Sequence, residues 1–365
     1  MIASLAGLRV GLIGPMPPPA GGMANQTRQL AELLRGERAS VTVVRSNAPY
    51  QPSWLAALPG VRALCRLVPY LLALWRAAGR SDVFHVMANS GWSWHLFAVP
   101  AIWIARARGV PVVVNYRGGD AAALHARSEA LVRRSMSRTA SLIVPSGFLH
   151  QVFERHGMAS EVVPNIIDLR HFAPAATGPR DFGDAPHLIV ARHLEPIYDN
   201  ATALRAFAQV RQHWPKARLT IAGTGPELAA LQALAAELAV ADAVQFTGYL
   251  ERDAMAALYR QADVAINPSR VDNMPNSVLE ALASGVPVVS TDVGGVPFIV
   301  DHDRTALLVP AGAPDAMAQA VLRVLGDASL RSRLHLAGLH DVQRYTWEQV
   351  APVLVGIYRR AVPAH

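Results

Sequence analysis

The stretch 264-VAINPSRVDNMPNSVLEALASGVPVVS-290 predicts a strand, a helix and a second strand, in that order. Val264–Ile266 and Pro287–Ser290 are short apolar runs, which are typical of strands buried on both faces of a sheet. The Met-Pro-Asn-Ser turn between them is suited to starting a helix at Pro275 or Asn276. Such an alternation of strand and helix predicts a parallel sheet that helices cover on both faces.

The same alternation extends outward over nearly the whole chain, in two series separated by a linker. The linker, residues 171–187, is rich in Pro, Gly and Asp. We therefore predict an α/β protein with doubly wound domains at residues 1–175 and 176–345, followed by a helix within residues 346–365. The first series of expected strands is Leu8–Gly14, Val41–Val44, Val83–Val86, Pro111–Val114, Leu142–Val144 and Val162–Pro164. The second is His187–Ala191, Arg218–Ala222, Val244–Thr247, Val264–Ile266, Pro287–Ser290 and Ala306–Val309.

The composition is that of a folded chain large enough for two cores. Of the 365 residues, 52% are hydrophobic and 17% are charged, and the mean hydropathy is +0.21. The single cysteine, Cys65, excludes an internal disulfide and a cluster of cysteine metal ligands. It suits a reducing compartment.

Positive charge is concentrated in the first half of the chain. Residues 1–178 contain 18 Arg, no Lys and 8 acidic residues, a balance of +10, whereas the remainder has a balance of −3. The first half therefore attracts anions such as anionic lipid, a phosphorylated carrier or nucleic acid. No recognisable nucleic-acid-binding module accompanies this charge, so we expect no nucleic-acid partner.

Neither a secretion signal nor a membrane span is predicted. Residues 1–14 lack a charged start followed by a long apolar run, and they are better interpreted as a first strand. Polar side chains and Pro100 interrupt the apolar residues 83–105, which favours a strand, a loop and a buried helix. We expect a cytoplasmic protein, with the inner face of the membrane as its site of peripheral attachment.

Two carboxylates, Asp272 and Glu280, flank the start of the helix in the opening stretch. Backbone N–H groups at Asn276–Val278 and the helix dipole would favour a phosphate there, and Glu280 would then lie near a ribose attached to it. Alternatively, Ser277-Val-Leu-Glu280 matches a capping box, in which Glu280 binds only a backbone N–H of its own helix. The spacing alone does not decide between these interpretations.

The acid pair and the residues after it resemble a known family. Asp272-x7-Glu280, followed by Ala-Leu-Ala-Ser-Gly-Val-Pro-Val-Val-Ser-Thr, is similar to the signature of the retaining family 4 glycosyltransferases. The resemblance implies the GT-B fold, in which two doubly wound Rossmann-like domains face each other across a cleft. It also implies that the acid pair contacts the donor sugar and the ribose of its nucleotide. The family usually has Glu at both positions, and Asp272 is one methylene shorter.

Other segments, taken together in their order and spacing, extend the resemblance over nearly the whole chain. Pro18–Gly22 resembles a loop whose backbone approaches the donor phosphates, and Phe246-Thr-Gly-Tyr249 resembles a loop near the nucleobase. Val163–Asp168, Gly223–Glu227 and Tyr345–Glu348 resemble three further family segments, the last of which begins a helix that crosses back to the first domain.

Two further positions depart from the family pattern. An Arg and a Lys usually contact the donor pyrophosphate, whereas the matching residues here are Arg192 and Tyr198. A loop of the first domain often carries His, but the matching residue is Arg117. Because a guanidinium does not act as a base at ordinary pH, Arg117 is expected to bind a phosphate or to hold the acceptor.

The resemblance thus implies a set of site residues and no cofactor. GT-B enzymes generally need no metal at the reaction centre, and the histidines show no metal-ligand spacing, so no metal is expected. The catalytic candidates are Asp272, Arg117 and Arg192. The donor-binding candidates are Gly21, Gly22, Arg192, Gly248, Tyr249, Asn276, Ser277 and Glu280.

Residues 58–78 predict an amphipathic helix in the basic half of the chain. Apolar residues recur there at helical spacing, and Arg62, Arg66 and Arg76 flank them. Either the apolar face packs against the core, or the helix lies on anionic lipid with Arg62, Arg66 and Trp75 in contact with the membrane. Pro69 is expected to kink or break the helix.

The family resemblance implies a retaining glycosyltransferase, and we expect it to move a hexose from a UDP- or GDP-linked sugar to a lipid-linked or polysaccharide acceptor in surface glycan synthesis. Its expected partners are the nucleotide-sugar donor, a glycan or lipid-linked acceptor and an anionic membrane surface. Two alternatives stay open. One is a nucleotide-sugar 2-epimerase of the same two-domain architecture. The other is a catalytically silent GT-B protein that serves as an interaction partner, which Tyr198 and Arg117 favour.

Overall fold

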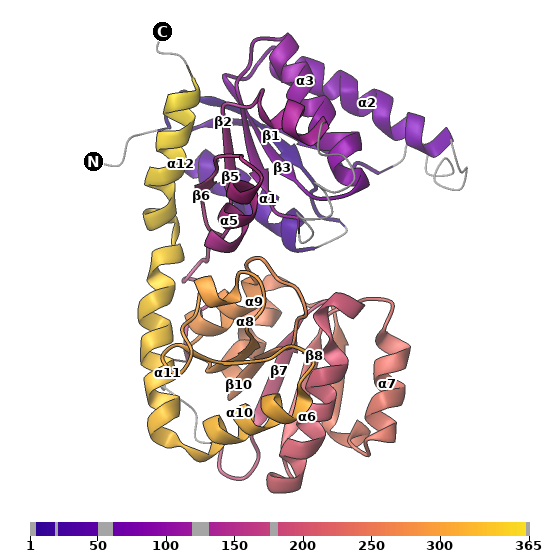
Figure 1. The fold of residues 1–365 in the computed structure, drawn as a ribbon, viewed down its shortest axis with the longest axis vertical. Helices are drawn as coiled ribbons and strands as arrows, with labels where there is room; N and C mark the ends of the chain where they lie inside the picture. The colour runs from indigo at the N-terminus through magenta and orange to yellow at the C-terminus, as the bar shows by residue number, and fades with distance from the viewer. Residues whose placement is uncertain (1–4, 19–20, 50–60, 119–130, 176–181, 363–365) are drawn as a thin grey trace. The chain divides into compact units, whose positions relative to one another are not determined.

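The computed structural model divides into two compact units, each built on a six-stranded parallel sheet (Figure 1). Unit 1 comprises residues 1–166 and 347–365, and unit 2 comprises residues 167–346. The structure describes the chain apart from residues 1–4, 19–20, 50–60, 119–130, 176–181 and 363–365, and apart from the side chains of residues 61–65. The first boundary follows Ile166 rather than residue 175, because Ile167 and Phe172 pack in a core of unit 2.

In unit 1 the strand order is β2-β1-β3-β4-β5-β6, so the order along the chain reverses between β1 and β3. The strands are β1 (Arg9–Gly14), β2 (Ser40–Arg45), β3 (Val83–Ala88), β4 (Val112–Tyr116), β5 (Ser141–Val144) and β6 (Glu161–Val162). The helices are α1 (Gly22–Gly36), α2 (Val61–Ala78), the π-helix η2 (Trp94–Ala98), α3 (Val99–Ala107), α5 (Gly147–Arg155) and α12 (Trp347–Ala361).

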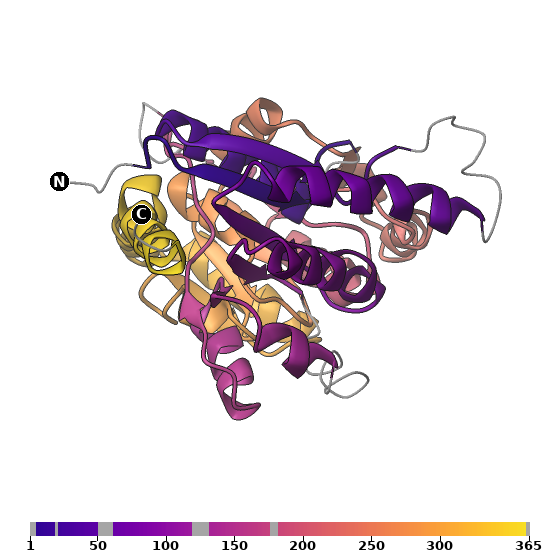
Figure 2. The same ribbon diagram turned by 90° about the horizontal axis from the view of Figure 1, so that it is seen from above.

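Each face of the unit 1 sheet has its own core, because successive side chains of a strand point to opposite faces. From β3, Phe84 and Val86 pack with α2, α3 and α5, whereas Val83 and Met87 pack with α1 and α12. Helices α2 and α3 lie side by side (Figures 1 and 2). The last helix, α12, completes the second of these cores with side chains such as Tyr358.

In unit 2 the strand order is β12-β11-β10-β7-β8-β9, and the order along the chain reverses between β7 and β10. The strands are β7 (His187–Ala191), β8 (Arg218–Ala222), β9 (Val244–Gly248), β10 (Val264–Asn267), β11 (Val288–Thr291) and β12 (Ala306–Val309). The α-helices are α6 (Asn200–His213), α7 (Leu228–Glu237), α8 (Arg252–Gln261), α9 (Asn276–Ala283), α10 (Pro314–Gly326) and α11 (Ala328–Asp341). Short 3₁₀ helices are η3 (Pro196–Tyr198), η4 (Ala241–Ala243), η5 (Val296–Phe298) and η6 (Val342–Tyr345).

Helices also cover both faces of the unit 2 sheet. Leu188 and Val190 of β7 pack with α6, α7 and α10, whereas Ile189 packs with α8 and α9. The opening stretch of sequence forms β10, α9 and β11, as predicted. In open parallel sheets, ligands bind beyond the carboxyl ends of the strands where the strand order reverses. In unit 2 that place is the end of β7 and β10.

Two local features differ from simple expectation, and both concern proline. Strand β6 ends at Val162 rather than Pro164, whose nitrogen has no hydrogen to donate to a neighbouring strand. Helix α2 is not broken at Pro69 but continues through it, and the buried Tyr70 and Leu74 that follow pack in the core. In the described part of the chain, no helix combines the length and hydropathy needed to cross a membrane.

Candidate active site

Arg192 lies directly after β7, and residues that follow β10 hold its guanidinium. Nε and Nη2 donate to Ser269 Oγ at 3.1 and 2.9 Å, and Nη1 donates to Ser277 Oγ at 3.4 Å. Ser269 is itself fixed, because its hydroxyl donates to Asn267 Oδ1 at 2.7 Å and its carbonyl accepts from Thr291 Oγ1 at 2.6 Å. The fold therefore places a cation between the carboxyl ends of β7 and β10.

Two further side chains contact this guanidinium. The Asp272 carboxylate forms an ion pair with Arg192 Nη2, and the two side chains are only 12% and 10% exposed. The ring of Tyr198 lies 4.3 Å from the guanidinium carbon, in a cation–π arrangement. Loss of hydration lowers the pKa of Arg192, but a guanidinium stays charged at physiological pH. Tyr198, at the position where the family resemblance suggests Lys, thus contacts Arg192 without adding a second charge.

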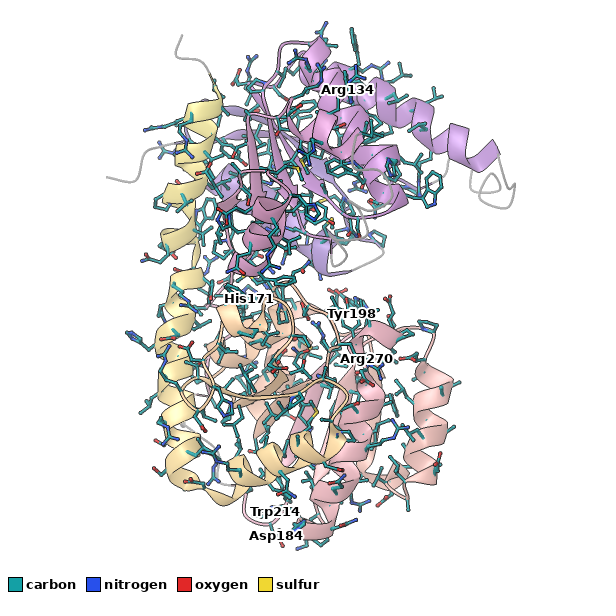
Figure 3. All side chains as sticks on the ribbon, viewed as in Figure 1. Arg134, His171, Asp184, Tyr198, Trp214 and Arg270 are labelled. Atoms are coloured by element: carbon teal, nitrogen blue, oxygen red, sulfur yellow. The ribbon has the colours of Figure 1, made fainter. Side chains whose placement is uncertain are left out.

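Neighbouring loops hold Tyr198 and Asp272 in place. Arg270 Nε donates to Asp199 Oδ2 at 2.8 Å, which ties the loop of Tyr198 to the loop that follows β10. Figure 3 shows Tyr198 and Arg270 at one end of unit 2 and Trp214 at the other. The site therefore belongs to the end of unit 2 at which the strands reach their carboxyl termini.

Glycines after β11 support the backbone of Asp272. The Gly295 N–H donates to Asp272 O at 2.8 Å. At Gly294, where φ is +54°, an added Cβ would lie 2.1 Å from Asp272 O, so a side chain does not fit there. The position of Asp272 is therefore set by the loop after β11 as well as by its own loop.

Glu280 contacts α8 and is not part of a capping box. Tyr259 Oη lies 3.2 Å from Glu280 Oε2 and 3.0 Å from Ser277 O. Helix α9 has no side-chain cap at its N-terminus. Loss of hydration raises the pKa of Glu280 to about 7, against the opposing effects of a hydrogen bond from Tyr259 and of the charges on Arg252 and Arg192. A carboxyl group with this pKa is a candidate functional group.

The other donor-binding candidates of unit 2 lie near the same strand ends. Asn276 is the first residue of α9, but the Val278 N–H already donates to Pro275 O at 3.2 Å, contrary to the expectation that it is available for a phosphate. Gly248 ends β9, and its carbonyl accepts from the N–H of Gly223 at 2.9 Å.

Gly223 lies between the carboxyl end of β9 and that of β7 and contacts both. An added Cβ at Gly223 would lie 1.9 Å from Arg192 O, so the two backbones are in close contact. Tyr249, the residue after Gly248, is 39% exposed. The ends of β7, β8 and β9 thus form a continuous edge from Arg192 to Tyr249.

In unit 1, the predicted residues Gly21, Gly22 and Arg117 are linked through α1. Among the described residues, none has an atom within 4 Å of a Cβ added at Gly21 or Gly22, and Gly22 is exposed. One turn later, Gln26 Oε1 accepts from Arg117 Nη1. Arg117 Nε also donates to Asn115 Oδ1 at 3.0 Å. Burial lowers the pKa of Arg117 to about 9, so it carries its charge at neutral pH.

A buried hydrogen-bonded chain extends from Arg117 to α12, and the sequence analysis missed it. Asn115 Nδ2 lies 3.1 Å from His85 Nε2, and His85 Nδ1 lies 2.8 Å from Tyr358 Oη. Loss of hydration, with a smaller contribution from Arg117, lowers the pKa of His85 to about 3, so its ring is neutral. The sequence did hold one indication of this chain, a polar residue in each of two apolar strands: His85 in VFHVMA and Asn115 in VVVNY. The partner on α12 was not predictable from local sequence.

The structure thus brings together four predicted residues of unit 2: Arg192, Asp272, Ser277 and Glu280. It adds Ser269 and Tyr259, which the sequence analysis did not assign. The position of Ser269, directly after a strand at the reversal of strand order, was a usable signal. Tyr259 occurs in an ordinary amphipathic helix and gave none.

The predicted membrane-contact residues differ in where their side chains lie. Trp75 is 49% exposed and, with Val68 and Leu72 at 52% each, forms an apolar stripe on the outer side of α2. Arg66 Nη2 donates to Ala48 O at 3.2 Å, so this side chain points back onto the protein. The side chain of Arg62 lies outside the described residues. Helix α2 therefore has a core-facing side and a separate exposed apolar stripe.

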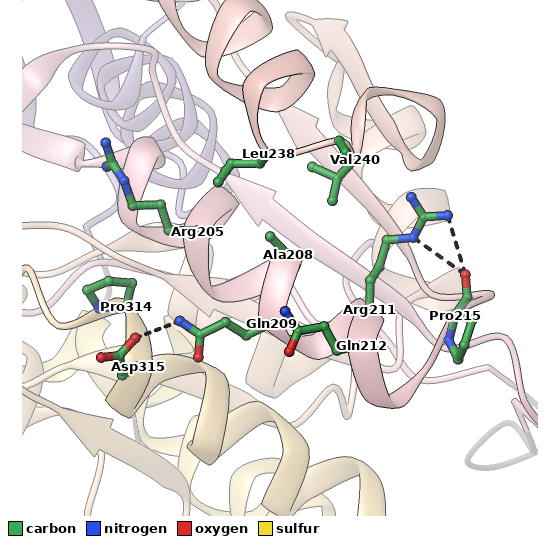
Figure 4. Close-up of a pocket in the computed structure, with 11 residues that line it drawn as sticks. Arg205, Ala208, Gln209, Arg211, Gln212, Pro215, Leu238, Val240, Pro314 and Asp315 are labelled. Carbon is green, nitrogen blue, oxygen red and sulfur yellow. Dashed lines mark hydrogen bonds between the residues drawn. The ribbon is translucent and has the colours of Figure 1, made fainter.

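A hollow lies away from Arg192 in unit 2, on the outer side of α6 (Figure 4). It has a volume of about 710 Å³, and Arg205 and Arg211 are among its lining residues. Gln209 Nε2 donates to Asp315 Oδ1 at 2.6 Å, and Arg211 Nε to Pro215 O at 3.4 Å. This hollow shares no lining residue with the surroundings of Arg192.

The chain is similar to curated glycosyltransferases, and solved structures share its fold. A D-inositol 3-phosphate glycosyltransferase of Corynebacterium jeikeium is 26% identical over 94% of this chain and 93% of its own. A GDP-mannose-dependent alpha-(1-6)-phosphatidylinositol monomannoside mannosyltransferase of Mycobacterium tuberculosis is 31% identical over 54% of this chain and 55% of its own. The sucrose-phosphate synthase structure from Thermosynechococcus elongatus matches 97% of this chain and 98% of its own, with a TM-score of 0.76 and 22% identity. Anabaena HepE in complex with UDP matches 96% and 99%, with a TM-score of 0.72 and 15% identity.

Models of known families match both halves of the chain. The model described as Glycosyltransferase Family 4 matches residues 20–171, and the model described as Glycosyl transferases group 1 matches residues 186–327. With most of both units matched and the fold shared with solved relatives, the chain belongs to the family 4, group 1 glycosyltransferases of GT-B fold.

Proposed function

We propose that this glycosyltransferase moves a hexose from a UDP- or GDP-linked sugar to a lipid-linked or polysaccharide acceptor, with retention of the anomeric configuration. The observation that carries the proposal is the position of Arg192 and Glu280 at the carboxyl ends of β7 and β10. A fixed cation suits a diphosphate, and a carboxyl group one turn into α9 suits the ribose hydroxyls. The names of similar proteins support a sugar nucleotide: one is GDP-mannose-dependent, and a structure of HepE contains UDP and glucose.

Arg192 is proposed to act on the leaving group. Breaking the bond to the sugar leaves negative charge on the diphosphate, which a preorganised guanidinium stabilises. Its hydrogen bonds to Ser269 and its contact with Tyr198 fix the guanidinium before the donor binds. The carboxylate of Asp272, which pairs with Arg192 in the structure, is proposed to turn to the hexose when the diphosphate takes its place.

No metal or other cofactor enters the proposal. The family resemblance suggests that the donor phosphate accepts the proton of the acceptor hydroxyl, so a separate base is not required. Arg117, which stays charged, is proposed to bind the acceptor or a phosphate on it. A phosphate on a lipid-linked acceptor would suit its guanidinium.

The proposed surface for the acceptor side is the outer stripe of α2. Val68, Leu72 and Trp75 are exposed at helical spacing, and the guanidinium of Arg108 lies 4.8 Å from the Trp75 ring. An apolar stripe with arginines beside it suits the interface of an anionic membrane. We therefore propose peripheral attachment to such a membrane through α2.

The release of nucleoside diphosphate tests the proposed reaction. The full chain is incubated with a panel of UDP- and GDP-linked hexoses, with and without membrane lipid extract as the source of acceptor. We expect one donor to give nucleoside diphosphate and a glycosylated lipid or polysaccharide product, with the donor configuration kept in the product. Conversion of the donor to its 2-epimer without acceptor would instead establish the epimerase alternative.

A further inference from the structure

The hydroxyl of Tyr259 faces two oxygen atoms but has only one proton to donate. Tyr259 is buried, and its Oη lies 3.0 Å from Ser277 O and 3.2 Å from Glu280 Oε2. A backbone carbonyl can only accept a hydrogen bond, and an ionised carboxylate can only accept as well. With Glu280 ionised, one of the two contacts would therefore bring two oxygens together with no proton between them.

A proton on Glu280 satisfies both contacts. Tyr259 then donates to Ser277 O, which is the nearer of the two oxygens, and Glu280 donates to Tyr259 Oη. This arrangement places one proton in each of the two contacts. Tyr259 and Val278, which neighbour these contacts, are both buried. A polar atom left without a hydrogen bond in such a place lowers the stability of the folded state.

The positive charges that face Glu280 are each engaged by another carboxylate. Arg192, which follows β7, is paired with Asp272. Arg252 of α8 lies 3.2 Å from Asp168 Oδ2. Neighbouring Arg170 and Arg252 hold the pKa of Asp168 at about 2, so this partner of Arg252 stays ionised. The cations on both sides of Glu280 are thereby partly neutralised, and they offset its loss of hydration only in part.

We propose that Glu280 is a neutral acid while the site is empty, that Tyr259 positions its proton, and that binding of a nucleotide releases this proton to the solvent. The inference rests on the proposed function, in which Glu280 contacts the ribose. Two ribose hydroxyls each donate a hydrogen bond to the ionised carboxylate, and these two bonds compensate for the proton lost from the contact between Glu280 and Tyr259. The proton leaves Glu280 for the buffer, and no covalent bond of the nucleotide changes.

The sign of the pH dependence follows from this linkage. Because the complex contains the ionised form and the empty site holds the protonated form, removing protons favours binding. Nucleotide affinity is therefore expected to rise with pH, by at most tenfold for each pH unit, and to level off above about pH 7, where the empty site is also ionised. A structural carboxylate that is ionised in both states would give no such slope.

Calorimetric titration of the full chain with UDP and with GDP tests the proposal. Each titration is run at pH 6.5 in two buffers of different ionisation heat, which gives the number of protons released. The terminal phosphate of the nucleotide also titrates near this pH, so the matched control is Glu280→Gln with the same nucleotide. A second variant, Tyr259→Phe, removes only the hydroxyl, and its melting temperature checks that the fold is kept.

We expect the wild-type chain to release up to one proton more than Glu280→Gln, and Tyr259→Phe to reduce this excess. Equal proton release by the wild type and Glu280→Gln would overturn the inference and leave the proposed function intact. An unchanged excess in Tyr259→Phe would overturn the role of Tyr259. Failure of both nucleotides to bind the wild type would overturn the inference together with the proposed function.

Discussion

At the scale of single residues, the site depends on how Arg192 is held before any donor arrives. Its guanidinium donates to Ser269, stacks on Tyr198 and pairs with Asp272. The serine and tyrosine contacts fix its position, whereas the carboxylate contact compensates its charge. A diphosphate can replace the carboxylate contact without disturbing the other two. Asp272 is one methylene shorter than the usual Glu, and its carboxylate still reaches Arg192.

The two acids of the pair are expected to have different kinetic effects. Glu280→Gln removes the charge and one of the two acceptor oxygens, and it should raise the Kd for UDP or GDP by about 10- to 100-fold, since a hydrogen bond to a charged group contributes about 1.5–3 kcal/mol. Asp272→Asn keeps the size of the side chain and should lower kcat while the Kd changes little. Both constants are measured by calorimetry and by steady-state kinetics. A loss of thermal stability in Glu280→Gln with unchanged nucleotide affinity would show a structural role instead.

The protonation of Glu280 should also appear in the stability of the chain without nucleotide. Its pKa is raised in the folded state to about 7, from an ordinary value of 4.5. The stabilisation that comes from the bound proton is therefore fully present below pH 4.5 and is lost as the pH rises through 7. Glu280→Gln cannot lose this proton, so its melting temperature relative to wild type should increase between pH 5 and 8. A difference that is constant over this range would contradict a raised pKa.

At the scale of elements, α12 is joined to the strands of unit 1 by a hydrogen-bonded chain whose direction is fixed. Arg117 can only donate, so Asn115 Oδ1 accepts from it and Asn115 Nδ2 faces His85 Nε2. The neutral His85 ring must then carry its proton on Nδ1 and donate it to Tyr358 Oη. Helix α12 is thereby connected to Arg117 through His85 and Asn115.

Removing the Tyr358 hydroxyl should destabilise unit 1. Tyr358→Phe leaves the buried N–H of His85 without its acceptor, which costs about 1–3 kcal/mol. The effect is measured by denaturant unfolding of the full chain. Tyr345→Phe, in which the hydroxyl removed belongs to unit 2, is the matched control. A change within about 0.5 kcal/mol for Tyr358→Phe would show that the chain of hydrogen bonds contributes little.

The outer stripe of α2 makes a separate prediction about membranes. The full chain should sediment with vesicles that contain anionic phospholipid and do so less at high salt, because screening weakens attraction to the surface. Replacing Arg62, Arg66 and Arg76 with Ala should reduce sedimentation, and replacing Arg205, Arg211 and Arg323 of unit 2 should not. Unchanged sedimentation of the first variant would remove α2 as the attachment site.

At the scale of the whole molecule, the fold was predictable and part of the site was not. Apolar runs such as Val264–Ile266 report burial directly, and their alternation with helices predicts the two parallel sheets. By contrast, Ser269 meets Arg192 only because β10 pairs with β7, and Tyr259 meets Glu280 only because α8 packs beside α9. Such contacts depend on topology, and no local pattern reports them. Likewise, Pro69 indicated a kink or a break, whereas the helix continues past it to Tyr70 and Leu74, whose packing in the core is not visible in the sequence.

A crystal structure of the full chain with bound UDP or GDP tests the central claim most directly. We predict that the diphosphate lies within hydrogen-bond distance of the Arg192 guanidinium and that the ribose hydroxyls contact the Glu280 carboxylate. A nucleotide bound instead in the hollow beside Arg205, with the Arg192–Asp272 ion pair and the surroundings of Glu280 untouched, would contradict the account.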